Sequence, residues 1–596
     1  MEISGRDYHI FLLKAVLLIG FAWGGFLLAL VGFFYASIVV VTTIIAGILI
    51  LHGASKNGFS FLPSREISIA SILFLLVTIS FLYFSTPSVF TGRDQGSFSE
   101  AAIRLSQNHQ LEFSTPTSEE FFKLNQPGRA LNFPGFYYTL DGKLITQFSL
   151  AYISWLALFF SLFGLIGFSI ANGVLFFTFL MSFYMLGRMS LKVSNTIPMM
   201  LFAITSFVFM WFSKFTLSEN MALMLIWVAI LSLMLFLKNF KALPFTVFLL
   251  TTGLLCFTRI EGLAFLVTSI VILALNEDAR KYIGQKLFLR FFLPVILFSL
   301  VFVANAFSDI YFYKEIAKAL LPSVSSPKAT YLGQIKNNVL PDFYTIKIFC
   351  LYGLIGFFFV GGAGMIISFW KKEYHKLIPF FFVAPTFIYL FDSQITPDHP
   401  WMLRRFMFSI LPIAIYYSGL FFGHLLENRS TDRKHHRSKI LSVAIIAILV
   451  GMNLPAFSKY FTFSENEGLL TQVQEFGEKF SADDLILIDQ KASGDGWSMI
   501  AGPMNFLHGK NAVYFFNNHD LTKLDTSKFK NIYLVSPNEQ VPLYLSSTIG
   551  EKLTPVSDYK FNLTKLNIQP ASPLKDLSLP EKLQTEIGGK VFKVTR

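Results

Sequence analysis

Several short stretches of this sequence place ionisable side chains directly beside long apolar runs. In the first, Gly92-Arg93-Asp94-Gln95 follows an apolar run and precedes a predicted helix. A carboxylate at the membrane edge, such as that of Asp94, is suited to accept a proton from the hydroxyl group of an acceptor molecule. The alternative is that Asp94 is a turn carboxylate beside Gly92 with no chemical role.

The helix that follows Asp94 carries its own predicted start signal. Ser97 and Glu100 fit the S-x-x-E capping box, in which the two side chains satisfy free backbone N–H groups at a helix start. We therefore expect a helix capped by Ser97 that runs to about Asn108. Asp94 would lie before this cap, so capping does not require it.

A second stretch reads Asp398-His399-Pro400-Trp401 and continues to Arg404-Arg405. Two adjacent guanidinium groups offer paired donors and permanent charge, which suits them to bind a phosphate. The alternative is that one arginine reaches the lipid headgroups. Asp398 and His399 could bind substrate or a divalent metal, but no second ligand cluster with recognisable spacing accompanies them. The sequence therefore predicts no metal site and no cofactor.

A third group of ionisable residues lies at the starts of two other apolar runs. Arg259 and Glu261 occupy a tight turn, and ionisable groups near membrane depth usually line a cavity. A local pair between Arg259 and Glu261 is an equally good explanation. Glu219, in Thr216-Leu217-Ser218-Glu219, fits a capping box for the following helix, and we favour that structural role for it.

The composition indicates a membrane protein. Of 596 residues, 53% are hydrophobic and 14% are charged, against roughly 25% charged in an average soluble domain. The net charge of +12 could suggest nucleic acid, but the cations lie mainly in short linkers between apolar runs, so no nucleic-acid partner is predicted. Cys256 and Cys350 both lie within apolar runs, which makes a disulfide framework improbable.

The apolar runs predict a mainly α fold, a polytopic transmembrane helix bundle. A span needs roughly 20 helical residues, and the sequence offers about thirteen runs: 11–31, 33–52, 67–86, 168–188, 198–213, 219–237, 244–257, 260–275, 291–311, 346–369, 377–391, 406–424 and 440–455. We divide the chain into an N-terminal transmembrane hairpin (1–66), a transmembrane catalytic module (67–455) and a soluble tail (456–596).

The linkers between the runs set the predicted orientation. Basic residues cluster in one set of linkers, which the positive-inside rule places in the cytoplasm: Lys238 and Lys241, Arg280 to Arg290, Lys371, Lys372 and Lys376, and Arg429 to Lys439. This assignment requires that the apolar segment 149–166 does not cross, and we interpret it as a helix along the outer interface. The loop 87–167, the loop 312–345, the linker 392–405 and the tail then lie outside the cytoplasm.

The tail reads as a small α/β domain. Helical periodicity covers 468–480, and strands are predicted at 485–489, 512–516 and 531–535. It shows no phosphate-loop glycine pattern, zinc spacing or nucleophile elbow. We expect it to be structural or to bind the acceptor.

Taken in order, these motifs resemble the C-type glycosyltransferases, polytopic membrane enzymes related to the protein O-mannosyltransferases and to the aminoarabinose transferase of lipid A. GRDQGSFSEAAIRL resembles the first-loop segment that carries the family's catalytic carboxylate. The aromatic stretch 133–164 resembles its interfacial helices, and the other echoes are SKFTLSENMALML, GLLCFTRIEGLAFL and HPWMLRRFMFSILP. This sequence departs from some relatives in that Asp94 has no acidic neighbour.

The resemblance implies a glycosyltransferase of the cell membrane whose donor is a sugar on a polyprenyl phosphate. Asp94 would be the general base on the acceptor hydroxyl. Arg404 and Arg405, with Arg259, would bind the donor phosphate, and Glu219, Glu261, Asp398 and His399 are further candidates for substrate binding. The acceptor could be a lipid, a glycan or a protein. The alternatives are a transporter or lipid flippase, and a non-catalytic membrane protein that recruits envelope partners through its tail.

Overall fold

The structure, a computed structural model, describes residues 3–56, 61–308, 343–391, 398–427, 432–494, 496–517, 521, 523–568 and 577–595. Most of the predicted outer loop 312–345 and residues 392–397 of the predicted linker lie outside the described residues.

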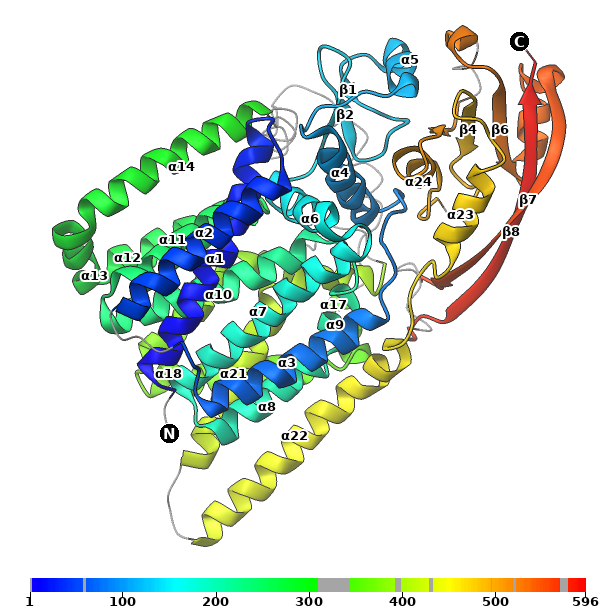
Figure 1. The fold of residues 1–596 in the computed structure, drawn as a ribbon. Coiled ribbons are helices and arrows are strands. Elements are labelled where there is room, and N and C mark those ends of the chain that lie inside the picture. The colour runs from blue at the N-terminus through cyan, green and yellow to red at the C-terminus, as the bar shows by residue number, and fades with distance from the viewer. Residues whose placement is uncertain are drawn as a thin grey trace, which may run out of the picture.

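A bundle of helices makes up most of the molecule (Figure 1). Six of the described helices are long and apolar enough to cross a bilayer: α1 (Gly5–Leu30), α2 (Ala36–Lys56), α3 (Arg65–Tyr83), α7 (Ile166–Ser190), α10 (Ser218–Asn239) and α22 (Asp432–Tyr460). Large apolar side chains on α2 and α3 face outward, among them Ile48, Leu49 and Ile72. Exposed apolar surface of that extent needs lipid as its solvent, so the chain is a multi-pass membrane protein.

Three further spans are formed only if a bent helix pair counts as one. These pairs are α12 (Glu261–Leu275) with α13 (Glu277–Tyr282), α17 (Tyr344–Leu351) with α18 (Ile355–Trp370), and η4 (Trp401–Leu403) and α20 (Arg404–Met407) with α21 (Ile410–Glu427). The predicted span 346–369 is bent by 102° between α17 and α18. Gly353 makes the bend, with φ of +70° and its α-carbon packed against the backbone of Met452.

Other apolar runs form helices too short to count as full spans. The predicted span 198–213 is divided between α8 (Val193–Ile204) and α9 (Phe207–Phe212). The predicted span 377–391 is divided among η2 (Tyr374–Leu377), α19 (Ile378–Val383) and η3 (Ala384–Leu390). α11 (Ala242–Cys256) has 15 residues, whereas α14 (Phe288–Ser308) has 21 residues and is not short by this measure. Because the described helices give six to nine spans, the predicted count of about thirteen is not confirmed.

The segment 149–166 forms α6 (Leu150–Phe163), a helix of 14 residues. At 1.5 Å per residue it is about 21 Å long, less than the hydrocarbon thickness of a bilayer. Its first ten residues are buried, and it packs against α4, α1 and α7. The length favours the non-spanning interpretation, although protein rather than lipid covers most of the helix.

The first loop folds into a small subdomain. It contains α4 (Asp94–Asn108), α5 (Pro116–Asn125) and an antiparallel sheet of β1 (Gly128–Arg129), β2 (Phe136–Tyr138) and β3 (Leu144–Thr146). This subdomain lies at one end of the bundle, beside the C-terminal sheet (Figure 1).

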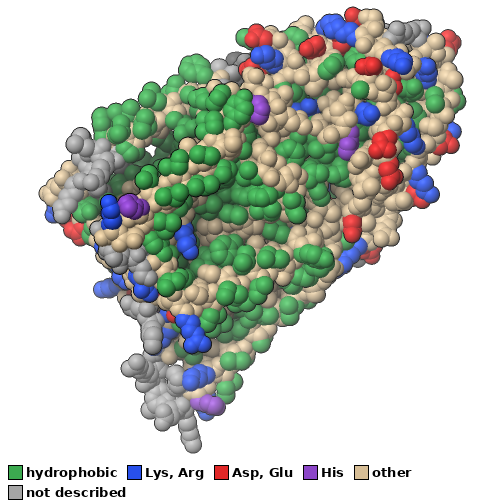
Figure 2. Space-filling model, viewed as in Figure 1, with side chains coloured by type: hydrophobic (Ala, Val, Ile, Leu, Met, Phe, Trp, Pro, Cys, Tyr) green, Lys and Arg blue, Asp and Glu red, His purple; other side chains and the backbone are tan. Residues whose placement is uncertain are grey.

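The tail forms a five-stranded sheet in the order β5-β4-β6-β8-β7. The predicted helix and strands are confirmed as α23 (Leu469–Gly477), β4 (Leu485–Asp489), β5 (Asn511–Phe515) and β6 (Ile532–Pro537). β4 runs parallel to both neighbours. The antiparallel hairpin of β7 (Leu553–Leu566) and β8 (Lys582–Val594) was not predicted. Charged side chains gather on this part of the surface, whereas apolar side chains cover the helices (Figure 2).

Candidate functional site

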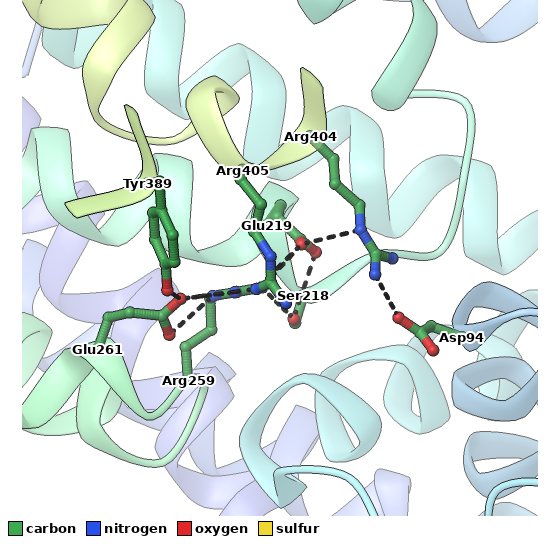
Figure 3. Close-up of polar contacts among 8 residues, drawn as sticks. All are labelled: Asp94, Ser218, Glu219, Arg259, Glu261, Tyr389, Arg404 and Arg405. Carbon is green, nitrogen blue, oxygen red and sulfur yellow. Dashed lines mark hydrogen bonds and ion pairs between the residues drawn. The ribbon is translucent and has the colours of Figure 1, made fainter. Parts of the chain in front are cut away.

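One cluster of ionisable side chains lies where four segments of the chain meet (Figure 3). Three of these segments are helix starts: those of α4, of α10 and of α12 with the turn before it. The fourth consists of α20 and the nearby helix η3. Together they contribute Asp94, Ser218, Glu219, Arg259, Glu261, Tyr389, Arg404 and Arg405.

Asp94 and Arg404 meet directly, although 310 positions separate them in the sequence. A guanidinium nitrogen of Arg404 donates to a carboxylate oxygen of Asp94 at 2.7 Å. Two residues that the sequence names as site candidates, Asp94 and Arg404, are therefore in direct contact. The side chain of Asp94 is 43% exposed and that of Arg404 is 14% exposed, so the carboxylate is the accessible partner.

Asp94 is placed by a helix start four residues earlier than the sequence predicts. α4 begins at Asp94 itself, its N-cap is Arg93, and no side chain caps it. The predicted capping box is wrong, because Ser97 donates instead to the carbonyl of Pro134 and Glu100 pairs with Arg104 at 3.6 Å. Gly96 explains the early start, since its α-carbon lies against the carbonyl of Phe90 and leaves no room for a β-carbon.

Arg259 is held by two buried acids. It pairs with Glu219 at 2.9 Å and with Glu261 at 2.7 Å, and it donates to the hydroxyl of Ser218 at 3.0 Å. The capping role favoured for Glu219 is wrong, because Leu217 is the N-cap of α10 and no side chain caps it. The local Arg259–Glu261 pair is present, but it belongs to a larger network.

Arg404 and Arg405 are held more loosely by the same acids. Glu219 lies 3.7 Å from Arg404 and 4.0 Å from Arg405, and Glu261 lies 3.7 Å from Arg405. The Nε atoms of both arginines are buried and have no hydrogen-bond partner among the residues that the structure describes. The Nε atom of Arg404 is the one that faces Glu219 at 3.7 Å, so it takes part in an ion pair without a hydrogen bond. Buried donors are normally satisfied, and these two arginines are therefore held less tightly than Arg259.

Charge in the cluster is balanced by number. Three carboxylates (Asp94, Glu219 and Glu261) face three guanidinium groups (Arg259, Arg404 and Arg405). The hydroxyl of Tyr389 donates to Glu261 and fixes that carboxylate further. Glu219 and Glu261 are the buried members, so their geometry suits them to hold the arginines.

The pKa of Asp94 follows from these charges. Burial by the surrounding protein opposes ionisation of the carboxyl. The charge and hydrogen bond of Arg404, together with the charges of Arg405 and Arg259, outweigh burial and hold the pKa below its ordinary value. Asp94 is therefore ionised at neutral pH, as a proton acceptor must be.

Asp398 and His399 are neighbours in the sequence but have different surroundings in the structure. Asp398 pairs with Arg93 at 3.3 Å, one residue from Asp94. His399 is fully buried, and its contact is with the hydroxyl of Tyr352 at 3.1 Å. Burial, only partly opposed by Asp398, lowers the pKa of His399 to about 4. The structure brings Asp398 to the edge of the site and gives His399 a neutral, enclosed position.

Metal ligation finds no support in the described part of the chain, where no three His, Cys, Asp or Glu side chains group together in a way that could hold an ion.

Sequence reasoning missed several residues of this site. Tyr389 lies within an apolar run, and nothing in its local sequence distinguishes it from a core tyrosine. Arg93 and Trp401 belong to the two motifs that contain Asp94 and Arg404. Their closeness in sequence to these candidates was the signal that could have identified them. Trp497, in the tail, could be linked to the site only through the fold.

No family model matches this sequence, and no curated protein matches it. Among solved structures, the fold is similar to ArnT from Cupriavidus metallidurans in the apo state, with a TM-score of 0.47 and 9% identity over 88% of this chain and 97% of that one. The same protein bound to undecaprenyl phosphate gives a TM-score of 0.46 and 9% identity over the same shares. Arabinofuranosyltransferase AftD from Mycobacteria gives 0.41 and 10% identity, over 90% of this chain and 42% of that one.

These likenesses are distant. They concern the arrangement of the chain alone, and the chemistry of the site rests on the side chains of this chain.

Proposed function

We propose that this protein is a membrane glycosyltransferase that moves a sugar from a polyprenyl phosphate to an acceptor hydroxyl. The observation that carries the proposal is the meeting of one accessible carboxylate, Asp94, with Arg404, which is followed directly in the chain by a second arginine, Arg405. A base and a phosphate-binding pair in contact are the two parts that such a transfer needs.

The proposed reaction is a single displacement. Asp94 takes the proton of the acceptor hydroxyl, and the acceptor oxygen forms a bond to the anomeric carbon of the sugar. The bond between that carbon and the phosphate oxygen breaks, and polyprenyl phosphate leaves with the electron pair. Arg404 and Arg405 stabilise the negative charge that develops on the phosphate. One displacement inverts the configuration at the anomeric carbon.

Donor binding would also prepare the base. In the structure, Arg404 donates a hydrogen bond to Asp94, and its positive charge stabilises that carboxylate. A donor phosphate that approaches Arg404 competes with this bond, and the pKa of Asp94 then rises because the stabilising charge is shared. The carboxylate becomes a better proton acceptor when the donor is in place.

The sidedness of the reaction follows from the helix ends. α10 and α12 begin at the site with Glu219 and Glu261, and α10 ends at the opposite side with Lys238. Lys238, Asn276, Tyr374 and His375 line one cavity there, so Lys371 and Lys372 lie at that end too. The positive-inside rule makes this the cytoplasmic end. The site and the C-terminal sheet would therefore be extracytoplasmic.

A transporter or lipid flippase is the second candidate, favoured by the three bent helix pairs. Transporters of this kind bind substrate near the bilayer midplane. Here the cluster includes Asp94 of α4, which belongs to the first-loop subdomain at one end of the bundle, and this favours chemistry at the membrane edge.

Binding of the lipid product tests the arginine pair without knowledge of the sugar or acceptor. Purified protein in nanodiscs is titrated with undecaprenyl phosphate, and Arg404→Gln combined with Arg405→Gln is compared with Arg129→Gln, an exposed arginine of the first loop. Loss of charge-assisted donors should weaken binding at least tenfold in the double variant and leave the control unchanged. Equal affinity in all three proteins would remove the phosphate site.

Turnover tests the reaction itself. The same preparation is incubated with polyprenyl-phosphate hexose, pentose and aminopentose in the presence of an envelope extract as acceptor, and released polyprenyl phosphate is measured. Release with one donor is expected. Lipid movement between leaflets without release of phosphate would support the flippase instead.

A further inference from the structure

The guanidinium group of Arg93 is enclosed between two tryptophan rings from distant parts of the chain. It lies 4.4 Å from the ring centre of Trp401 and 4.6 Å from that of Trp497. Its edge pairs with Asp398 at 3.3 Å. A planar cation between two aromatic faces is attracted to both rings by cation–π interactions, and this attraction is stronger where water is excluded.

The backbone on each side of this stack is also in close contact. A β-carbon at Gly92 would lie 2.3 Å from the carbonyl group of Trp497 and 2.4 Å from the carbonyl oxygen of Gly496. The loop that carries Trp497 therefore rests directly on the residue before Arg93. Trp401 is itself packed by Phe215, at 5.0 Å between ring centres, and is buried.

Two of the three stacked residues lie close in the chain to the reacting groups. Arg93 precedes Asp94, and Trp401 precedes Arg404 by three residues within one short helical segment, η4 and α20. Trp497 belongs to the tail, between β4 and α24. A clamp built on Arg93 can thus set the distance between the carboxylate and the guanidinium that face each other at 2.7 Å.

We infer that Arg93 is a positioning residue of the active site and that the C-terminal sheet domain acts on the reaction through Trp497. The stack holds the Asp94 loop against the segment that bears Arg404 and Arg405. The tail then contributes to the catalytic site. Its contribution affects the rate of turnover and not the affinity for the lipid donor. A shift of about 1 Å between reacting groups can lower a rate a hundredfold.

The inference rests on the proposed function, because it concerns the geometry of Asp94 and Arg404. It can nevertheless fail alone. If Asp94→Asn stops turnover but disruption of the stack does not, the proposed function stands and the positioning role falls. If Asp94→Asn is fully active, the proposed function falls first.

The experiment compares four changes of the stack with one control. Arg93→Lys keeps the charge but lacks the flat face, and Arg93→Met removes the charge. Trp497→Ala removes the outer ring, and Trp497→Phe restores a ring. Leu543→Ala removes another exposed apolar side chain of the tail and serves as the control. Thermal unfolding of each variant shows whether it is folded.

We expect Arg93→Lys, Arg93→Met and Trp497→Ala to lower kcat about tenfold or more, with undecaprenyl phosphate affinity within twofold of the wild type. Trp497→Phe should recover most of the loss, and Leu543→Ala should match the wild type. The acid limb of kcat against pH should also move to higher pH in Trp497→Ala, because the pair between Asp94 and Arg404 would be weaker. A role in folding alone would lower the unfolding temperature without the kcat and pH changes.

Two results would overturn the inference. One is wild-type kcat in Trp497→Ala and Arg93→Lys. The other is a loss that falls equally on kcat and on lipid affinity and that Trp497→Phe does not restore.

Discussion

The guanidinium groups of Arg259, Arg404 and Arg405 all lie within 4.0 Å of one carboxylate oxygen of Glu219, and like charges gathered around one point repel one another. Glu219 and Glu261 offset this repulsion. The side chain of each is largely buried and contacts at least two of the three guanidinium groups. Their role differs from that of Asp94, which contacts only Arg404 and remains open to a substrate. Buried ion pairs of this kind contribute geometry, since their desolvation cost offsets much of the attraction.

Neutralising Glu219 should therefore destabilise the fold. Glu219→Gln leaves Arg259, Arg404 and Arg405 with one carboxylate fewer, and loss of one partner of a buried pair costs about 3–5 kcal/mol. Thermal or denaturant unfolding in detergent would show it. Glu277→Gln is the matched control, because Glu277 pairs with Lys281 at an exposed position and should change stability by less than about 0.5 kcal/mol. Equal stability of both variants would contradict the buttressing role.

Replacing Arg404 should change the pH dependence of the reaction. Burial raises the pKa of Asp94 and Arg404 lowers it, so Arg404→Gln leaves burial less opposed and the pKa rises. Catalysis needs the ionised carboxylate, and the acid limb of kcat against pH should move to higher pH. Arg405 acts on Asp94 through its charge without a hydrogen bond, so Arg405→Gln should shift the acid limb less. An unchanged or lowered limb in Arg404→Gln would contradict the pairing.

At the level of elements, α4 does the most to create the site. Its start at Asp94 places the carboxylate in the first turn, where the helix dipole favours negative charge. One turn further on, Glu100 is buried beside Arg104, and α4 packs on both α6 and α24 of the tail.

Glu100 gives α4 a pH-dependent stability. Burial, only partly offset by Arg104, raises the pKa of Glu100 from 4.5 to about 7. The stabilising contribution of the protonated form is complete below pH 4.5 and is lost as the pH rises through 7. The loss amounts to about 3 kcal/mol at most. The unfolding temperature of the wild type should therefore fall over this range relative to Glu100→Gln, whose profile should be flatter. Parallel profiles would contradict the raised pKa.

The sequence was informative about elements wherever a local pattern decided them. Hydrophobic runs located the helices α1, α2, α3, α7 and α10, and short apolar runs in the tail located β4, β5 and β6. The bends were not predictable, because the kink at Gly353 depends on the approach of Met452 from α22. The capping boxes predicted at Ser97 and Thr216 failed for a related reason, since tertiary contacts took over their side chains.

The site shows the same division. Residue types and their order along the chain were enough to name Asp94, Arg404 and Arg405. The roles of Glu219 and Glu261 as partners of three arginines depended on contacts across 40 to 200 positions of sequence, which no local pattern records.

At the scale of the whole molecule, the C-terminal sheet domain is docked on the first loop. Thr86 donates to the carbonyl of Glu465 at 2.7 Å, Gln107 to that of Phe506 at 2.9 Å, and Asn132 to that of Tyr514 at 2.8 Å. Lys528 pairs with the buried Glu120 at 2.7 Å. The tail, the first loop and the reacting side chains therefore share one end of the molecule.

This arrangement predicts the topology of labelling in cells. On a background with Cys256→Ala and Cys350→Ser, a membrane-impermeant maleimide should label Thr548→Cys in the tail from outside. Asn239→Cys, at the basic end of α10, should be labelled only after permeabilisation. Both positions are exposed, so accessibility to solvent is matched. The reverse pattern would place the site in the cytoplasm and contradict the use of an extracytoplasmic acceptor.

The most direct test of the account is the turnover of Asp94→Asn at saturating donor, measured as polyprenyl phosphate released by folded protein in nanodiscs. The account predicts a loss of about 10²–10⁴-fold, the usual contribution of a general base, with undecaprenyl phosphate still bound. Asp141→Asn, an exposed aspartate of the same loop, should keep wild-type turnover. Full activity of Asp94→Asn beside an equally active control would contradict the claim that this carboxylate and the arginine pair form one catalytic site.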